Sequence, residues 1–145
     1  MNFHSLHQKI NRIATNQYYE GDFGNPINIG VLSELTNNIK ELSYYSDFLK
    51  EFGYGELDPS FYIEELPVHS FEIFPNEKKH LKDLYIFATD QSELSYVCDI
   101  SDFCRVKSVS ACGEVSEIET DDFESFIEAK ILEILEMVKW RNENL

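Results

Sequence analysis

Carboxylates are the most abundant side chains that could do chemistry in this chain, with 27 Asp and Glu residues against 12 Lys and Arg. Hydrolysis by two carboxylates needs them about 5–10 Å apart with different pKa values. Asp90 and Asp99 flank a predicted hairpin and could approach each other. The same positions suit turn residues that satisfy local backbone groups, which is the interpretation we favour. A small acid–base hydrolase stays a minor alternative.

Histidine, serine and glycine patterns predict no further catalytic or cofactor site. His4 and His7 would share one helix face, but no HExxH motif follows them. No GxSxG motif surrounds a serine. Gly53-Tyr54-Gly55 follows a helical segment, so it predicts a helix stop instead of a dinucleotide-binding loop. We expect no catalytic residue, no cofactor and no metal.

Cysteine usage and the N-terminal segment indicate a cytoplasmic location. Cys98, Cys104 and Cys112 are an odd number of cysteines without a CxxC pair, which favours reduced thiols. The N-terminal segment lacks the continuous apolar core and cleavage site of a signal peptide. No apolar run approaches the length of about 20 residues that a membrane span needs.

The formal net charge of −15 is unevenly distributed along the chain. Such a field repels phosphate backbones and anionic lipids, so we expect no direct nucleic-acid or membrane binding. No Lys or Arg occurs over residues 108–129, and a second acidic group follows Tyr54. A single-sign segment favours association with a basic protein, although it could also serve solubility. The candidate partner-binding residues are Tyr54, Glu56, Asp58, Glu114, Glu117, Glu119, Asp121 and Asp122.

Helices are predicted at both ends of the chain. Apolar residues recur at three- and four-residue steps over residues 2–17, and a Gly- and Asn-rich loop over residues 20–28 follows. Similar spacing predicts a second helix from near Ile29 and a third that stops at Gly53.

The last segment predicts a long C-terminal helix. Asp121 followed three residues later by Glu124 resembles a capping box, with Asp121 as the cap. An apolar stripe then runs from Phe123 to Val138. Trp140, near the end of this helix, is with Tyr54 a candidate aromatic anchor for a partner.

Strands are predicted in the middle of the chain, where short aromatic and β-branched runs alternate with turns. The predicted strands cover residues 61–63, 71–74, 84–88, 94–98, 105–109 and a short run around 115–118. Residues 77–83 could form one polar helical turn. Helices, then strands, then a helix indicate an α+β fold. We expect a single domain over residues 1–145, with N-terminal helices, a mainly antiparallel sheet of about five or six strands, and the long C-terminal helix packed on it.

Several weak motifs follow one another in an order that resembles a known family. A helix ends in a Phe-Leu pair and a glycine turn, a strand ends in Phe-Ala-Thr-Asp, and the closing helix begins with Asp-Phe. The residues that carry the pattern are 48–57, Ile63, Ile73, 84–90, 96–99, Val106 and 122–127. Over residues 29–135 the chain resembles the SUKH superfamily, which includes fungal glucan-synthesis regulators and bacterial immunity proteins. Residues 1–28 would add an N-terminal helix and loop.

The resemblance implies a non-enzymatic protein-binding module. Bacterial members commonly neutralise a cognate toxin, often a nuclease, so an immunity protein (antitoxin) for a basic toxin domain is the leading hypothesis. The alternative is a regulatory or scaffold protein linked to cell-wall or glucan synthesis, as in the fungal members. Neither the identity of the partner nor the oligomeric state follows from the sequence.

Overall fold

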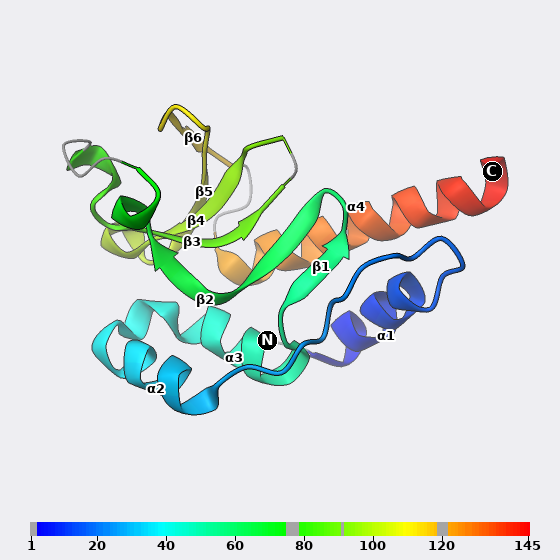
Figure 1. Cartoon of the computed structure of the whole chain (residues 1–145), viewed down its shortest axis with the longest axis horizontal. Helices are drawn as coiled ribbons and strands as arrows, with labels where there is room; N and C mark the ends of the chain where they lie inside the picture. The colour runs from blue at the N-terminus through cyan, green and yellow to red at the C-terminus, as the bar shows by residue number, and fades with distance from the viewer. Residues whose placement is uncertain (1–2, 75–78, 91, 119–121) are drawn as a thin grey trace.

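A computed structural model describes residues 3–74, 79–90, 92–118 and 122–145. Within these residues, six strands form one sheet in the order β1-β2-β3-β4-β5-β6, and each strand is antiparallel to the next. The strands are β1 (Gly55–Asp58), β2 (Phe61–His69), β3 (Leu84–Thr89), β4 (Ser95–Asp99), β5 (Arg105–Val109) and β6 (Val115–Glu117). The strands therefore follow one another across the sheet in sequence order, without a crossover connection (Figure 1).

Helices precede and follow the sheet. They are α1 (Phe3–Ala14), α2 (Ile29–Asn38), α3 (Ser43–Phe52) and α4 (Phe123–Asn144), with short 3₁₀ helices η1 (Lys40–Leu42), η2 (Ser70–Glu72), η3 (Lys79–Leu81) and η4 (Ile100–Asp102). The long helix α4 lies along one face of the sheet, and α1 packs beside it (Figure 1). The predicted α+β architecture, with its antiparallel sheet and long C-terminal helix, is confirmed.

The main core lies between the sheet, α3 and α4, and aromatic rings connect these layers. The Phe123 ring centroid is 5.1 Å from that of Phe87 on β3, 5.6 Å from that of Tyr45 and 6.0 Å from that of Phe48, the latter two on α3. All four side chains are at most 2% exposed. The Tyr45 hydroxyl donates to the backbone carbonyls of Phe87 and Glu64, which satisfies this buried polar group.

The opposite face of the sheet carries a second, smaller core under the segment between β2 and β3. Its members are Phe74, Leu81, Leu84, Ile86, Val97 and Val109. The prediction of a strand over residues 71–74 is wrong. His69 Nδ1 accepts the N–H of Phe71 at 3.1 Å, and the Ser70 hydroxyl donates to Leu81 O, so the chain turns into η2. Phe71 and Phe74 of this run cover the sheet instead of joining it, whereas Ile73 is exposed. Helix η3 lies within the predicted polar turn.

Helix α4 begins one residue later than its sequence pattern predicts. Its N-cap is Asp122, whose Oδ1 accepts the N–H of Ser125 at 2.7 Å. The predicted cap, Asp121, lies outside the described residues, and the observed cap is one position further along the chain. A helix that starts at Phe123 places this ring in the core from its first turn.

Gly53 ends α3 as predicted, and no other residue type fits there. Its φ of 86° and ψ of −167° lie in a region that is essentially restricted to glycine. A Cβ atom at this position would lie 2.5 Å from the carbonyl oxygen of Asn25. The chain then enters β1, a strand that the sequence pattern does not predict. The sharp turn brings β1 against β2, where Gly55 pairs with Ile63.

Replacing Phe123 by Ala should lower the free energy of unfolding by about 3–5 kcal/mol, because the change leaves a cavity among rings that cannot collapse into it. Urea unfolding followed by circular dichroism measures the change. Leu132→Ala is the matched control, since Leu132 lies on the same helix with 45% of its side chain exposed. The control should change stability by less than about 0.5 kcal/mol. Equal losses in the two variants would contradict this assignment of the core.

Candidate protein-binding surface

The two acidic segments lie at opposite edges of the sheet. Glu56 and Asp58 belong to β1, the first strand in the sheet order, whereas Glu117 belongs to β6, the last. Neighbouring strands are spaced about 4.8 Å apart, and Figure 1 shows β1 and β6 well separated. The described residues of the two segments therefore form two separate surfaces.

The outer edge of β1 is covered by the segment that follows α1. The N–H groups of Gly24 and Asn25 both donate to Tyr54 O, and the Tyr54 N–H donates back to Asn25 O. The Glu56 N–H donates to Asp22 Oδ1 at 2.8 Å. Tyr54 and Glu56 are half-buried, and this edge of the sheet is already paired within the chain.

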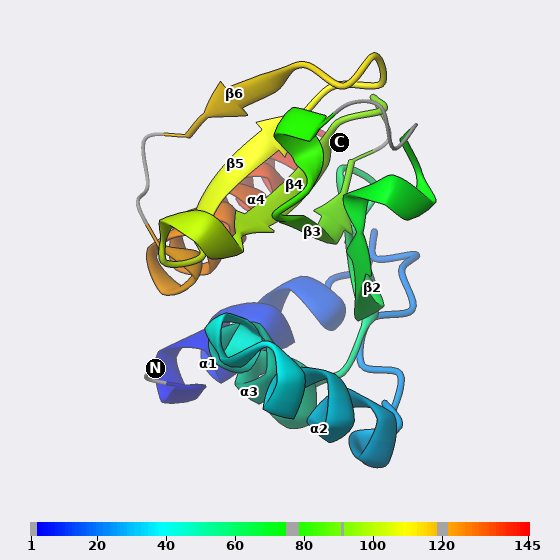
Figure 2. The ribbon, with the colours of Figure 1, turned by 90° about the vertical axis from the view of Figure 1, so that its left-hand side faces the viewer.

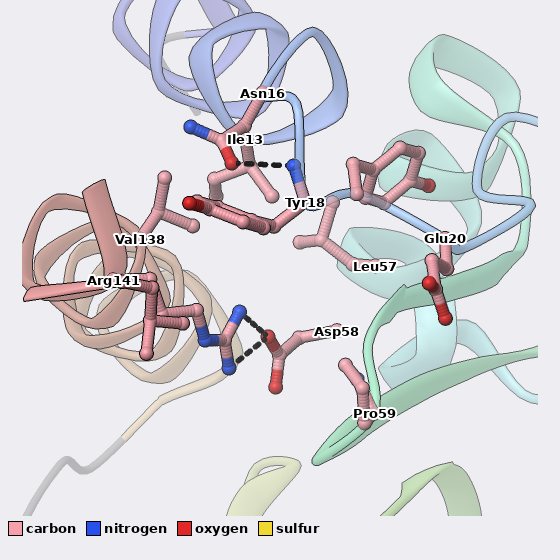
Figure 3. A pocket seen from close by; sticks show the side chains of 11 residues that line it. Ile13, Asn16, Tyr18, Glu20, Leu57, Asp58, Pro59, Val138 and Arg141 are labelled. Atoms are coloured by element: carbon pink, nitrogen blue, oxygen red, sulfur yellow. Dashed lines mark hydrogen bonds and ion pairs between the residues drawn. The ribbon is translucent and has the colours of Figure 1, made fainter.

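Asp58 is buried and has internal partners. Its Oδ1 lies 3.3 Å from both terminal guanidinium nitrogens of Arg141 on α4, and its Oδ2 accepts from the N–H and the hydroxyl of Ser60 at 2.9 and 2.6 Å. Figure 3 shows the pair at the wall of a cavity of about 220 Å³, which Tyr18 and Val138 also line. The carboxylate is 4% exposed, so its role in this structure is to attach α4 to the turn between β1 and β2.

The edge at β6 is open. Among the described residues β6 pairs only with β5, and all its residues are exposed. Glu114 before the strand, Glu117 at its end and Asp122 at the start of α4 are exposed as well. Glu119 and Asp121 lie outside the described residues. This edge presents both acidic side chains and a strand edge to a partner.

A partly enclosed charge cluster supports the end of this edge. Lys107 Nζ lies 2.7 Å from Asp99 Oδ2, 3.5 Å from Asp102 Oδ2 and 3.7 Å from Glu117 Oε1. Arg105 Nε lies 3.5 Å from Asp102 Oδ2. The side chains of Lys107 and Asp99 are only 13% and 11% exposed, whereas that of Glu117 is 69% exposed. The enclosed Asp99 carboxylate therefore neutralises the Lys107 ammonium group, whereas Glu117 stays accessible to solvent.

The ion pair between Asp99 and Lys107 joins β4 to β5. Burial pushes the pKa of Asp99 upward, but hydrogen bonds from Lys107 and Ser101 outweigh this effect, so the pKa lies below its ordinary value. The hydrogen bond to Asp99 raises the pKa of Lys107. Both shifts favour the charged pair.

Of the two predicted aromatic anchors, Trp140 is exposed and Tyr54 is not. Tyr54 is half-buried at the covered edge, and Trp140 is 59% exposed near the end of α4. Phe103, for which the sequence pattern gives no prediction, is 95% exposed between η4 and β5. A signal for it exists in the sequence, because a large apolar residue follows Asp102 in a polar turn between two strands.

Asp90 and Asp99 do not form a catalytic pair. Asp90 accepts the N–H of Leu94 at 2.9 Å just before β4 begins, whereas Asp99 is the last residue of β4. Asp99 lies five residue steps beyond Leu94, and an extended chain covers about 16 Å over that length. The expectation that the two carboxylates could approach each other is therefore wrong. Each one accepts hydrogen bonds from its own turn.

His7 and His69 contact oxygen atoms of other segments of the chain. His7 Nε2 lies 2.6 Å from Glu51 Oε1, and His69 Nε2 lies 2.7 Å from Lys82 O. Over the described ranges, no three His, Cys, Asp or Glu side chains are grouped as metal ligands would be.

The three cysteines, all among the described residues, are not joined by disulfides; Cys98 and Cys104 are buried and Cys112 is exposed. A hydrogen bond with Cys104 and burial raise the pKa of Cys98 well above its usual range. This thiol therefore stays protonated, and protonated thiols are poor nucleophiles. In the part of the chain that the structure describes, no helix has both the length and the apolar character needed to cross a bilayer.

A scan against protein-family models returns no match for this chain, and a search of curated proteins returns none either. The resemblance to the SUKH superfamily therefore stays a prediction that rests on the sequence motifs. The α+β architecture and the open edge at β6 are properties of the structure and do not depend on that resemblance.

Replacing Asp99 by Asn should lower the free energy of unfolding at pH 7 by about 1–3 kcal/mol, because Lys107 loses a charged acceptor. The folded-state pKa of Asp99 is lowered from its ordinary value of 3.8. The difference between wild type and variant should therefore be complete above that value and disappear as the pH falls through the lower folded-state pKa. Urea unfolding at pH 7 and at several acidic pH values measures it.

Glu128→Gln is the control for this experiment, since Glu128 is exposed on α4. It should leave stability within about 0.5 kcal/mol of wild type at pH 7. A stability loss in Asp99→Asn that stays constant down to the lowest pH would contradict an ion-pair role for Asp99.

Proposed function

We propose that this chain is a non-enzymatic protein-binding module, an immunity protein that neutralises a cognate basic toxin through its β6 edge. The observation that carries the proposal is the exposed strand edge at β6, which is flanked by Glu114, Glu117 and Asp122. An exposed edge strand is a common template for association, and the acids bias it toward partners of opposite charge.

Electrostatics supports a basic partner. No Lys or Arg occurs over residues 108–129, so the strand edge and the start of α4 share one sign of charge. A surface of this kind accelerates encounter with a basic protein and disfavours acidic ones. Nucleases are the leading toxin class, because a cleft that holds phosphates is itself basic. An acidic surface can occupy such a cleft in place of the nucleic acid.

The β6 edge supports the proposal better than the β1 edge does. At β1 the backbone groups are already paired with the segment after α1, and the Asp58 carboxylate is engaged by Arg141. Glu117 and Asp122 are exposed. Glu117 lies 3.7 Å from Lys107 and its side chain is 69% exposed, so a basic partner can contact this carboxylate without the loss of a buried ion pair.

The test is a pulldown from lysate of the native host, washed at low and then moderate salt, with bound proteins identified by mass spectrometry. We expect one basic protein to survive the moderate-salt wash, and the purified chain should inhibit its activity at a one-to-one ratio. The variant Glu114→Gln/Glu117→Gln/Asp122→Asn should weaken the complex at least tenfold. Asn is also a good N-cap residue, so this variant keeps the start of α4 intact.

The matched control is Glu34→Gln/Glu41→Gln/Asp47→Asn, which makes the same change in net charge. These three acids are exposed on α2, η1 and α3, and Figure 2 shows these helices at the opposite end of the molecule from β6. The control should bind like wild type. Equal weakening in both variants would mean that binding depends on net charge alone, and would contradict a role for the β6 edge. The absence of a retained basic protein would contradict the proposal and favour a regulatory module.

A further inference from the structure

Phe103 has an unusual position for a large apolar side chain. It is 95% exposed, the highest value for a large apolar residue within the described part of the chain. Its neighbour Cys104 is buried, with 5% exposed. The chain thus directs one residue of the turn into the core and the next one outward. Single exposed apolar side chains are common on protein surfaces, so the weight of this observation lies in how the backbone of the turn is held.

The backbone of this turn holds Phe103 in place. Phe103 has φ 52° and Cys104 has φ 58°, so two consecutive non-glycine residues adopt the left-handed conformation. This conformation is unfavourable for a bulky side chain and persists only where the surroundings impose it. Here the Cys104 N–H donates to Asp99 O at 2.8 Å, and the Ile100 N–H donates to Asp83 O at 2.9 Å.

The side chain of Asp99 completes the support of the turn. Its Oδ1 accepts from the N–H and the hydroxyl of Ser101 at 3.0 and 2.6 Å, and its Oδ2 contacts Lys107. The turn is fixed at both ends and in the middle. Phe103 is therefore pre-organised, so a partner that binds the ring would not have to order the loop first.

Acidic side chains lie close to this aromatic residue. Asp102 precedes it in the chain, and Lys107 bridges the carboxylates of Asp102 and Glu117 at 3.5 and 3.7 Å. Glu117 ends β6, the strand of the open edge. The turn that carries Phe103 is thus linked to the acidic edge through Lys107.

We propose that Phe103 is the anchor of the partner interface. It inserts into an apolar pocket on the partner, and Asp102 and Glu117 contact basic side chains at the rim of that pocket. An aromatic anchor surrounded by polar contacts is the usual arrangement of a binding hot spot. This inference rests on the proposed function, because it identifies where the basic partner of the β6 edge is held.

Phe103→Asn separates binding from folding. Asn tolerates the left-handed conformation better than Phe does, so the variant should unfold at a slightly higher temperature than wild type. It should nevertheless bind the basic partner at least 30-fold more weakly, the effect of losing a hot spot of about 2 kcal/mol. Calorimetric titration of the purified partner measures the affinity, and a thermal scan measures stability.

Tyr44→Ala is the matched control, because Tyr44 is an aromatic residue that is 55% exposed on α3. It should bind the partner like wild type. A retained partner that binds Phe103→Asn as tightly as wild type would overturn the anchor and leave the proposed function standing. Loss of affinity in both variants would also overturn it. If no basic protein is retained from the lysate, the proposed function and the anchor fail together.

Discussion

The packing of Phe123 against rings from β3 and α3 is the interaction on which the rest of the structure depends. Its ring centroid lies 5.1–6.0 Å from those of Phe87, Tyr45 and Phe48, so one side chain connects α4 to the sheet and to α3. Contacts of this kind combine burial with a preferred geometry. Because Phe123 is the first residue of α4, the same contacts determine where the helix begins and where its cap, Asp122, is presented. The position of Asp122 thus follows from the core.

The acidic residues behind the net charge of −15 include two groups, one buried in ion pairs and one exposed. Asp58 and Asp99 are buried carboxylates with cationic partners, and each one joins elements that are distant along the chain or adjacent in the sheet. A buried charge needs such a partner, because desolvation is unfavourable without one. The two sheet edges differ in the same way. The edge at β1 is paired within the chain, whereas β6 remains open beside exposed acids. This asymmetry is the physical basis for our proposal of a partner at β6.

Local patterns in the sequence predicted the elements whose burial is regular. The period-two alternation of residues 105–109 predicted β5 with its observed bounds. The absence of Lys and Arg over residues 108–129 indicated the acidic surface beside β6. The strand prediction for residues 71–74 is wrong because Phe71 and Phe74 cover the outer face of the sheet, a role that needs the same apolar composition as a strand. The burial of Asp58 depends on Arg141, 83 residues away, and the exposure of Phe103 depends on how a turn is supported. Neither is encoded in local spacing.

We propose that the chain binds a basic partner through the η4 turn, β6 and the start of α4. Amide hydrogen exchange of the chain, alone and saturated with the partner retained in the pulldown, locates the binding surface directly. We expect slower exchange on binding at residues 100–105, in β6 and in the first turn of α4, with no change in α2, α3 or β1. Slower exchange confined to β1 and the segment after α1, or no change anywhere, would contradict it.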